Sequence, residues 1–228
     1  MRHPVRWIVI GVAVVVIAAA GFGAWYVLGD DAPAKPTLST TGTTFAGGPS
    51  SIEGDWVVAP GAGVYLGYRM TEVFAGDVLH KTAVGRTTTV KGNMTIAANA
   101  VTEVVVTATM TDLKSDRGAR DNYIHTHGIE SDKYPTATFK LIKPIPLPQP
   151  VPKGDEVKVP ATGALTLHGV TKTVTIPLDA RWSGPTIQVV GTAPIVLADY
   201  KIEPPQTSVV KTDDHGALEL SLTFVPAK

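Results

Sequence analysis

The pair His125-x-His127 has the residue types and the spacing that best suit chemistry in this chain. On a β-strand, residues i and i+2 face the same side and could share a metal ion. The surrounding segment is polar and irregular, as in a helix or loop, where i and i+2 diverge. A structural metal site also needs three or four converging ligands, and no trio of carboxylates with suitable spacing lies nearby. We therefore predict solvated loop histidines and no metal site, and the same for His80, His168 and His215, which are scattered over turn-like positions.

Acidic and basic residues near the histidines offer a second set. Arg120-Asp121, together with Glu130 and Asp132, could form an acid/base pair. Such residues more often form a surface ion pair and a helix cap, which contribute about 0–1 kcal/mol, and this is our prediction. The chain has no Gly-x-Ser-x-Gly elbow, phosphate loop or His-Glu-x-x-His motif. We predict no catalytic residues, no enzyme activity and no resident cofactor.

The composition of the chain excludes several kinds of functional site. The chain has 228 residues and no cysteine, which excludes disulfides, thiolate metal sites and a cysteine nucleophile. Lys+Arg and Asp+Glu are balanced at 20 each, so no electrostatic footprint for nucleic acid is present. Asn93-x-Thr95 matches a glycosylation acceptor, but it falls in a predicted strand and we discount it.

The elements that must position these residues are predominantly β-strands. Hydrophobic and polar residues alternate in most segments after residue 52, most clearly in 218–224, where every even position is apolar. The segment 162–182 predicts a β-hairpin, with His168-Gly169 where the chain reverses. The segment 114–139 interrupts this rhythm with a short helix between about residues 119 and 129. We predict one antiparallel sandwich or barrel over residues 52–228.

The N-terminal region is organised differently. Trp7 to Leu28 forms an uncharged run of 22 residues, long enough to cross a hydrocarbon core of about 30 Å. Arg2 and Arg6 precede it, which places the rest of the chain on the extracytoplasmic side. We predict an uncleaved membrane anchor at 1–28, with a cleaved signal peptide and secretion as the alternative. Residues 29–51 are rich in Gly, Ser, Thr and Pro and predict a flexible linker.

Two motifs in the predicted domain resemble a known family. The first is Gly163-x-Leu165-Thr166-x-His168-Gly169-Val170-Thr171-Lys172-x-Val174. The second is Arg120-Asp121, a short helical segment, and then Asp132-Lys133-Tyr134-Pro135 with Phe139. Their order and spacing resemble the YceI-like, lipid/polyisoprenoid-binding family over roughly residues 52–227. This chain departs from the family pattern at Tyr123–Glu130, where an aromatic pair is lost, at Tyr68-Arg69, where a histidine is expected, and at Leu197–Lys201.

The resemblance implies a lipocalin-like antiparallel β-barrel around a polyisoprenoid or related amphiphilic lipid. The residues alone leave a filled core and a ligand cavity equally open, because the inward set mixes small residues with long ones. We expect a membrane-tethered carrier of a long apolar lipid, such as a polyisoprenoid or isoprenoid quinone. Its predicted partners are that lipid and the membrane, with a homodimer as a further candidate. The predicted lining residues are Val104, Val106, Ala108, Met110, Val174, Ile176, Leu178, Leu218, Leu220 and Leu222.

The segment 143–160 has proline at every second position from 144 to 152. Proline cannot donate to a β-ladder, so we predict no central strand here but a stiff hairpin loop. The alternative is a docking segment for a partner. In that case the protein would be a structural or interaction module of the cell envelope, with a filled barrel.

Overall fold

The computed structural model describes residues 32–39, 51–74, 79–208 and 210–228 of the chain. The larger compact unit is Ala34–Lys228, and the description below concerns that unit. Over the described ranges, no helix is both long enough and apolar enough to span a bilayer. The predicted anchor, Trp7 to Leu28, lies outside these ranges, so membrane anchoring stays a prediction.

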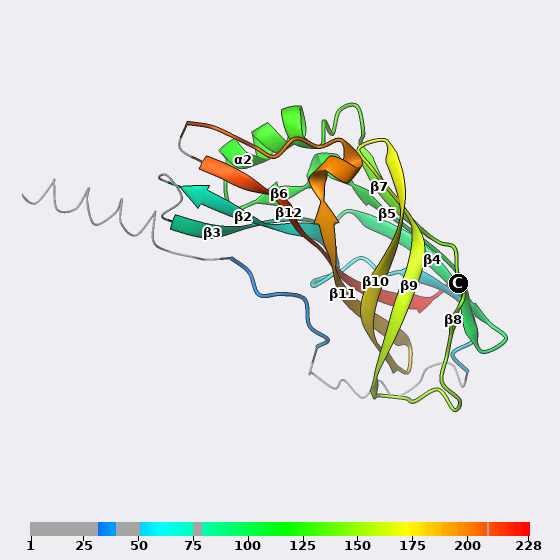
Figure 1. Cartoon of the computed structure of the whole chain (residues 1–228). Coiled ribbons are helices and arrows are strands. Elements are labelled where there is room, and N and C mark those ends of the chain that lie inside the picture. Colours follow the sequence, from blue (N-terminus) through cyan, green and yellow to red (C-terminus); the bar gives the residue numbers. More distant parts are fainter. Residues whose placement is uncertain (1–31, 40–50, 75–78, 209) are drawn as a thin grey trace, which may run out of the picture. The chain divides into compact units, whose positions relative to one another are not determined.

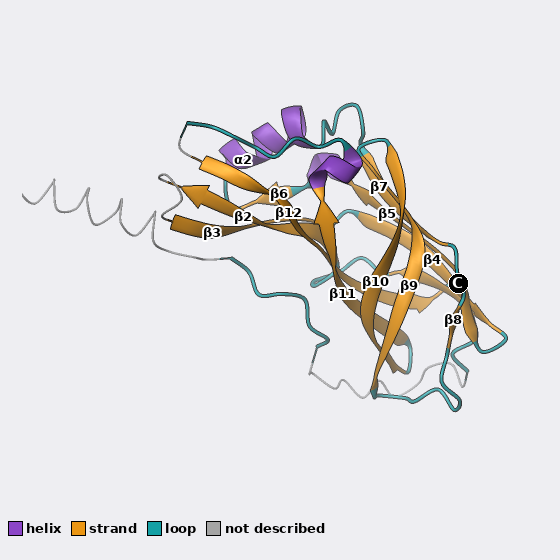
Figure 2. Ribbon diagram, viewed as in Figure 1, coloured by secondary structure: helices purple, strands orange, loops and turns teal. Residues whose placement is uncertain are grey.

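Eight antiparallel strands pair in a closed ring. Figures 1 and 2 show the barrel that they form. The ring closes because the first strand pairs with the last, with Val57 opposite Val225. Closure removes the unpaired edges that an open sheet would present. In ring order the strands are β1 (Gly54–Val58), β4 (Val90–Ala97), β5 (Ala100–Thr109), β7 (Thr136–Leu141), β9 (Glu156–Leu167), β10 (Val170–Ser183), β11 (Thr186–Val196) and β12 (Val210–Pro226).

Strand β12 is long enough to pair with two different strands along one edge. Its last residues pair with β1, whereas its earlier part pairs with β2 (Tyr65–Phe74). Beyond β2 the sheet continues into β3 (Leu79–Thr87) and the two-residue β6 (Lys114–Ser115). The last part of β12 therefore closes the ring by pairing with β1. Its earlier part extends the sheet into the β2–β3–β6 wall.

A short helical segment covers the end formed by β2 and β3 (Figure 2). It consists of α2 (Gly118–Tyr123) and the π-helical turn η2 (Ile124–Gly128). This confirms the helix predicted between about residues 119 and 129. Two 3-10 turns complete the secondary structure described, η1 (Met110–Asp112) and η3 (Leu197–Tyr200).

The hairpin predicted at 162–182 is confirmed as β9 and β10, with Val170 opposite Leu167. His168 and Gly169 form its turn with φ of 50° and 71°. Positive φ at both central residues suits the right-handed twist of a hairpin, and glycine adopts it without steric cost. The two strands stay paired along the length of β9, and the apolar positions of β10 face the inside of the barrel.

The proline-rich segment lies against the barrel at the end opposite α2 (Figure 1). Its two-residue strand β8 (Ile145–Pro146) pairs with Ala100 and Val101 of β5. The backbone N–H of Leu147 donates to the Asn99 carbonyl at 2.9 Å. The prediction of no central strand over 143–160 is confirmed up to residue 155 but is wrong for Glu156–Pro160, which begin β9 and pair with β10. The apolar side chains of the proline-rich segment turn inward, because Leu147 and Val151 pack against the core.

A six-residue stretch of the predicted linker also contacts the barrel, and we call Ala34–Ser39 the strap. Arg86 Nη2 donates to the Ala34 carbonyl at 2.8 Å, and Arg181 Nη1 donates to the Ser39 carbonyl at 2.8 Å. Arg86 is on β3 and Arg181 on β10, which are four strand steps apart in the sheet order. Four steps span about 19 Å, a distance that six extended residues cover. Leu38, a residue of the strap, is buried, with only 8% of its surface exposed.

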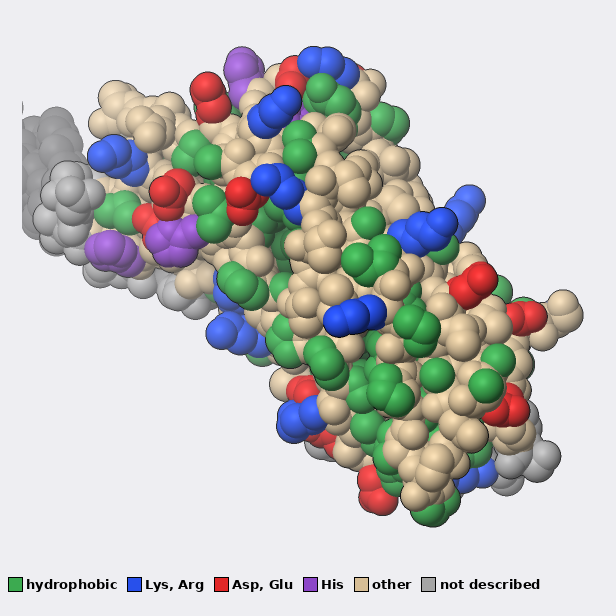
Figure 3. Space-filling model, turned by 45° about the vertical axis from the view of Figure 1, so that its right-hand side comes forward, with side chains coloured by type: hydrophobic (Ala, Val, Ile, Leu, Met, Phe, Trp, Pro, Cys, Tyr) green, Lys and Arg blue, Asp and Glu red, His purple; other side chains and the backbone are tan. Residues whose placement is uncertain are grey.

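A buried carboxylate lies on the outer face next to the strap. Glu219 is between inward-facing leucines on β12, so it points outward, yet only 1% of its surface is exposed. Its Oε1 lies 2.5 Å from Arg69 Nε, and its Oε2 lies 3.3 Å from Arg86 Nη2. Arg86 therefore connects Glu219 to the strap. Elsewhere, basic and acidic side chains are interspersed over the face drawn in Figure 3.

Candidate functional site

The barrel encloses a cavity of about 300 Å³. This volume is at the lower end of the range for ligand pockets. Its wall is made almost wholly of apolar side chains contributed by β2, β4, β5, β7, β9, β10, β11 and β12. The alternation of the strands explains this wall, because each strand turns every second side chain to the inside.

The structure brings most of the predicted lining residues together. Nine of the ten border the cavity; the tenth, Val174, packs against the core without bordering the cavity. Whether these side chains contact a ligand stays a prediction. The nine are Val104, Val106, Ala108, Met110, Ile176, Leu178, Leu218, Leu220 and Leu222.

Several lining residues were not predicted. Ile187 and Val189 follow the period of β11 and could have been found from the same alternation. Phe139 and Trp182 also border the cavity. The proline-rich segment contributes Leu147 and its neighbours, and no local pattern indicated that these side chains would turn inward.

Trp182 and the proline-rich segment close one end of the cavity. The indole Nε1 of Trp182 donates to the Gly184 carbonyl at 2.7 Å, which fixes the ring. The ammonium of Lys153 lies 5.4 Å from the centre of that ring. The Gly154 N–H donates to the Trp182 carbonyl at 2.7 Å. Together these contacts hold the proline-rich segment against β10, where the two close this end of the cavity.

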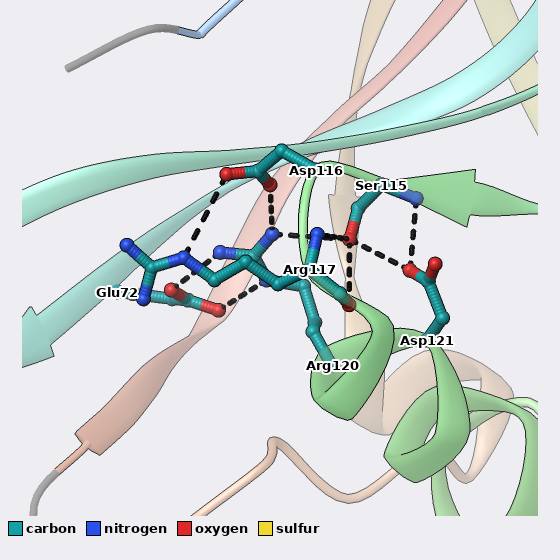
Figure 4. Close-up of polar contacts among 6 residues, drawn as sticks. All are labelled: Glu72, Ser115, Asp116, Arg117, Arg120 and Asp121. Carbon is teal, nitrogen blue, oxygen red and sulfur yellow. Dashed lines mark hydrogen bonds and ion pairs between the residues drawn. The ribbon is translucent and has the colours of Figure 1, made fainter. Parts of the chain in front are cut away.

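The opposite end of the cavity is polar, and Figure 4 shows its centre. Glu72 on β2 and Arg120 on α2 both border the cavity. Arg120 binds the carboxylate with two parallel hydrogen bonds, from Nε to Oε1 at 2.6 Å and from Nη2 to Oε2 at 2.8 Å. Its Nη1 donates to Ser115 Oγ at 3.1 Å and to Asp116. Burial lowers the pKa of Arg120, but the hydrogen bond and charge of Glu72 outweigh it, and the net shift is upward.

This arrangement corrects the prediction made for Arg120-Asp121. Arg120 does not form a surface ion pair, because α2 directs it across to β2, where its side chain is 10% exposed. Asp121 does not cap the helix either. Its Oδ1 accepts the Ser115 backbone N–H at 2.8 Å and the Ser115 hydroxyl at 2.6 Å. Arg120 and Asp121 thus anchor the helical segment to β2 and β6. This helical segment covers the polar end of the cavity.

The histidine pair does not converge on a common point. His125 Nε2 lies 2.9 Å from the Leu113 carbonyl, which can only accept, and its Nδ1 lies 2.8 Å from the Ser131 hydroxyl. His127 stacks on Tyr123, with ring centres 5.1 Å apart. In the part of the chain that the structure describes, no three His, Cys, Asp or Glu side chains gather as metal ligands. The prediction of a solvated loop histidine is therefore wrong for His125, which joins η2 to Leu113, the residue after η1.

The two sequence motifs meet in space at the hairpin turn. His168 Nε2 lies 2.8 Å from Glu130 Oε2, and its Nδ1 lies 2.9 Å from the Tyr200 carbonyl. The ring of Tyr134 meets the His168 ring edge-on at 4.6 Å. A side chain at Gly169 would come within 2.6 Å of Tyr134 Cε1. These contacts explain why both motifs are needed for one local structure.

The chain is similar in sequence to curated proteins from two Vibrio species. A UPF0312 protein of Vibrio parahaemolyticus is 35% identical over 127 residues, and one from Vibrio vulnificus is 34% identical. The match covers 52% of this chain and 64% of each relative. The chain thus spans slightly less than two thirds of the length of these curated relatives.

Solved structures show the same barrel. A polyisoprenoid binding domain from Saccharophagus degradans, implicated in plant cell wall breakdown, superposes with a TM-score of 0.58 at 16% identity, over 75% of this chain and 98% of that one. BcnA of Burkholderia cenocepacia superposes with a TM-score of 0.50 at 20% identity, over 68% and 95%. These likenesses establish the fold. The model of the YceI-like domain matches residues 67–224, more than half of the chain, and the protein therefore belongs to the YceI-like family.

Proposed function

We propose that this protein holds a long apolar isoprenoid lipid, either a polyisoprenoid or an isoprenoid quinone, inside its barrel. The observation that carries this proposal is the apolar cavity of about 300 Å³. Moving a hydrocarbon chain from water into such a cavity is favourable by about 0.8 kcal/mol for each buried CH₂. The function requires no chemical step, so we propose a binding protein rather than an enzyme.

The cavity has room for part of a lipid tail. In another protein an apolar cavity of about 150 Å³ admits benzene, so about 300 Å³ accepts on the order of a dozen carbon atoms. Met70, Met94 and Met110 border the cavity. Methionine side chains are flexible and fit irregular apolar partners, so we expect the wall to adjust to a longer tail.

The second candidate, an interaction module with a filled barrel, has less support. It required a proline-rich segment free to dock a partner. Ile145 of that segment is instead 6% exposed, and Leu147 borders the cavity. The segment is better suited to covering the ligand than to recruiting another protein.

Native mass spectrometry of the full-length protein, purified in nanodiscs from its own cells, tests the binding proposal. We expect an added mass that lipid extraction identifies as an isoprenoid. Refilling with a C20 polyprenol or a quinone should restore the added mass after delipidation. Protein that carries no isoprenoid and takes up neither probe would refute the proposal. The same spectra report whether the protein is a monomer or the homodimer considered above.

We also propose that the barrel lies on the extracytoplasmic side of the membrane, held by residues 1–28. The support is the uncharged run from Trp7 to Leu28 and the arginines before it. Protease added to intact spheroplasts should then remove the barrel from the membrane fraction. Full protection would reverse the orientation, and release into the medium without protease would favour the cleaved signal peptide.

A further inference from the structure

The polar end of the cavity holds one hydroxyl group whose hydrogen bonds are not used. Tyr68 is on β2 and borders the cavity. Its hydroxyl oxygen is buried and has no hydrogen-bond partner among the described residues. A buried polar group without a partner costs free energy, so such a group on the cavity wall is a candidate ligand contact.

The fold makes a specific place for this ring. Tyr68 lies opposite Gly85 of β3. A side chain at Gly85 would come within 2.3 Å of Tyr68 Cε1 and within 2.8 Å of its hydroxyl oxygen. The absence of a side chain at Gly85 therefore lets the ring pack against β3 at this position while it borders the cavity.

The phenol stays protonated. Burial is the main cause that raises the pKa of Tyr68 above its ordinary value, and Arg120 opposes the rise while Asp121, Glu72 and Asp116 add to it. A neutral phenol has one O–H to donate and lone pairs to accept with. It can therefore bind either a carbonyl or a hydroxyl group.

The charged groups next to Tyr68 leave no surplus positive charge for an anion. Arg181 also borders the cavity, but it lies at a distance from Tyr68 in the sheet, where it precedes Trp182 on β10 and donates to the Ser39 carbonyl. Arg120 uses Nε and Nη2 on Glu72, and Nη1 on Ser115 and Asp116. A phosphate could take over this guanidinium only by displacing Glu72, which is 7% exposed. The charges at this end are balanced, with carboxylates on Glu72, Asp116 and Asp121, and cations on Arg117, Arg120 and Lys81, the last lying opposite Glu72.

We propose that Tyr68 contacts the ligand's head group, and that the cavity selects isoprenoid lipids with an uncharged oxygen head over prenyl phosphates. The head would be an alcohol or a quinone carbonyl at the Tyr68 end, with the tail directed to Trp182. This inference rests on the proposed function, because it specifies the lipid class for the same cavity.

The test compares three C20 isoprenoids with one tail: an alcohol, a phosphate and a hydrocarbon without a head. Delipidated full-length protein in nanodiscs is loaded in three separate samples from phosphatidylcholine vesicles that hold the same amount of one lipid each, and bound lipid is quantified by mass spectrometry. We expect at least about tenfold more alcohol than phosphate. Tyr68→Phe should lower alcohol binding about fivefold to tenfold, as for the loss of one hydrogen bond, and leave hydrocarbon binding unchanged.

Tyr200→Phe is the matched control. The Tyr200 hydroxyl is also buried and lacks a partner among the described residues, but Tyr200 does not border the cavity. It should change none of the three bindings. If Tyr68→Phe binds the alcohol as the unchanged protein does, or if the phosphate binds best, the head-group inference is wrong while lipid binding survives. If none of the three binds, the proposed function itself fails.

Discussion

Replacing Ala180 with Trp should reduce isoprenoid uptake at least tenfold while the barrel still folds. Ala180 borders the cavity from β10, opposite Val189 of β11. A tryptophan side chain carries 150–250 Å² of surface, enough to occupy much of a cavity of about 300 Å³. Filling existing space costs less stability than overpacking a dense core, which typically costs about 1–3 kcal/mol. Uptake is measured as bound lipid per protein, with circular dichroism as the check on folding.

Two further variants sharpen this test. Ala108→Trp acts from the opposite wall, on β5, where Ala108 is fully buried. Ala97→Trp is the control, because Ala97 is an exposed position on β4, and its uptake should match that of the unchanged protein. If both cavity variants fold and still take up lipid, the lipid binds elsewhere and the inward faces assigned here do not form the site.

Arg120→Ala is expected to have the largest effect on stability. It would leave the carboxylate of Glu72 buried without the guanidinium that binds it at 2.6 and 2.8 Å. Removing one partner of a buried ion pair costs about 3–5 kcal/mol, because the other charge stays out of water. Urea unfolding of the full-length protein in nanodiscs, followed by tryptophan fluorescence, measures the change.

The neighbouring arginine provides the control for that loss. Arg117 is 25% exposed on its side chain and lies 3.6 Å from the exposed Asp116, so Arg117→Ala should cost about 1 kcal/mol or less. The double change Glu72→Leu with Arg120→Met should recover most of the stability, because apolar residues can replace a buried pair at little cost. Equal losses for Arg117→Ala and Arg120→Ala would show that the ion pair does not hold the helix.

Local alternation explains how much of this structure the sequence could predict. A strand repeats every two residues, so the inward faces of β5, β10 and β12 could be assigned without coordinates. The turn at His168-Gly169 followed from the residue types alone. The same local reasoning placed nine of the predicted residues on the cavity wall.

Contacts between distant parts of the chain could not be predicted in this way. Glu72 and Arg120 are separated by 48 residues, and nothing in the segment around Arg120 distinguishes a buried arginine from a surface one. Glu219 looked solvent-exposed because its neighbours alternate, yet arginines from β2 and β3 cover it. Tyr68 appeared only as a departure from the family pattern. These residues are specified by tertiary packing, which alternation does not encode.

The strap and β1 determine at which residue a recombinant fragment of this protein should begin. A fragment following the family match would begin at Gly67, removing Trp56, which is 2% exposed, together with the strand that closes the ring. The freed backbone groups of β4 and β12 would then be open to pairing with another molecule, a route to self-association. Starting at Ile52 keeps β1 but leaves Arg86 and Arg181 without the strap carbonyls. A fragment that begins at Ala34 retains both features.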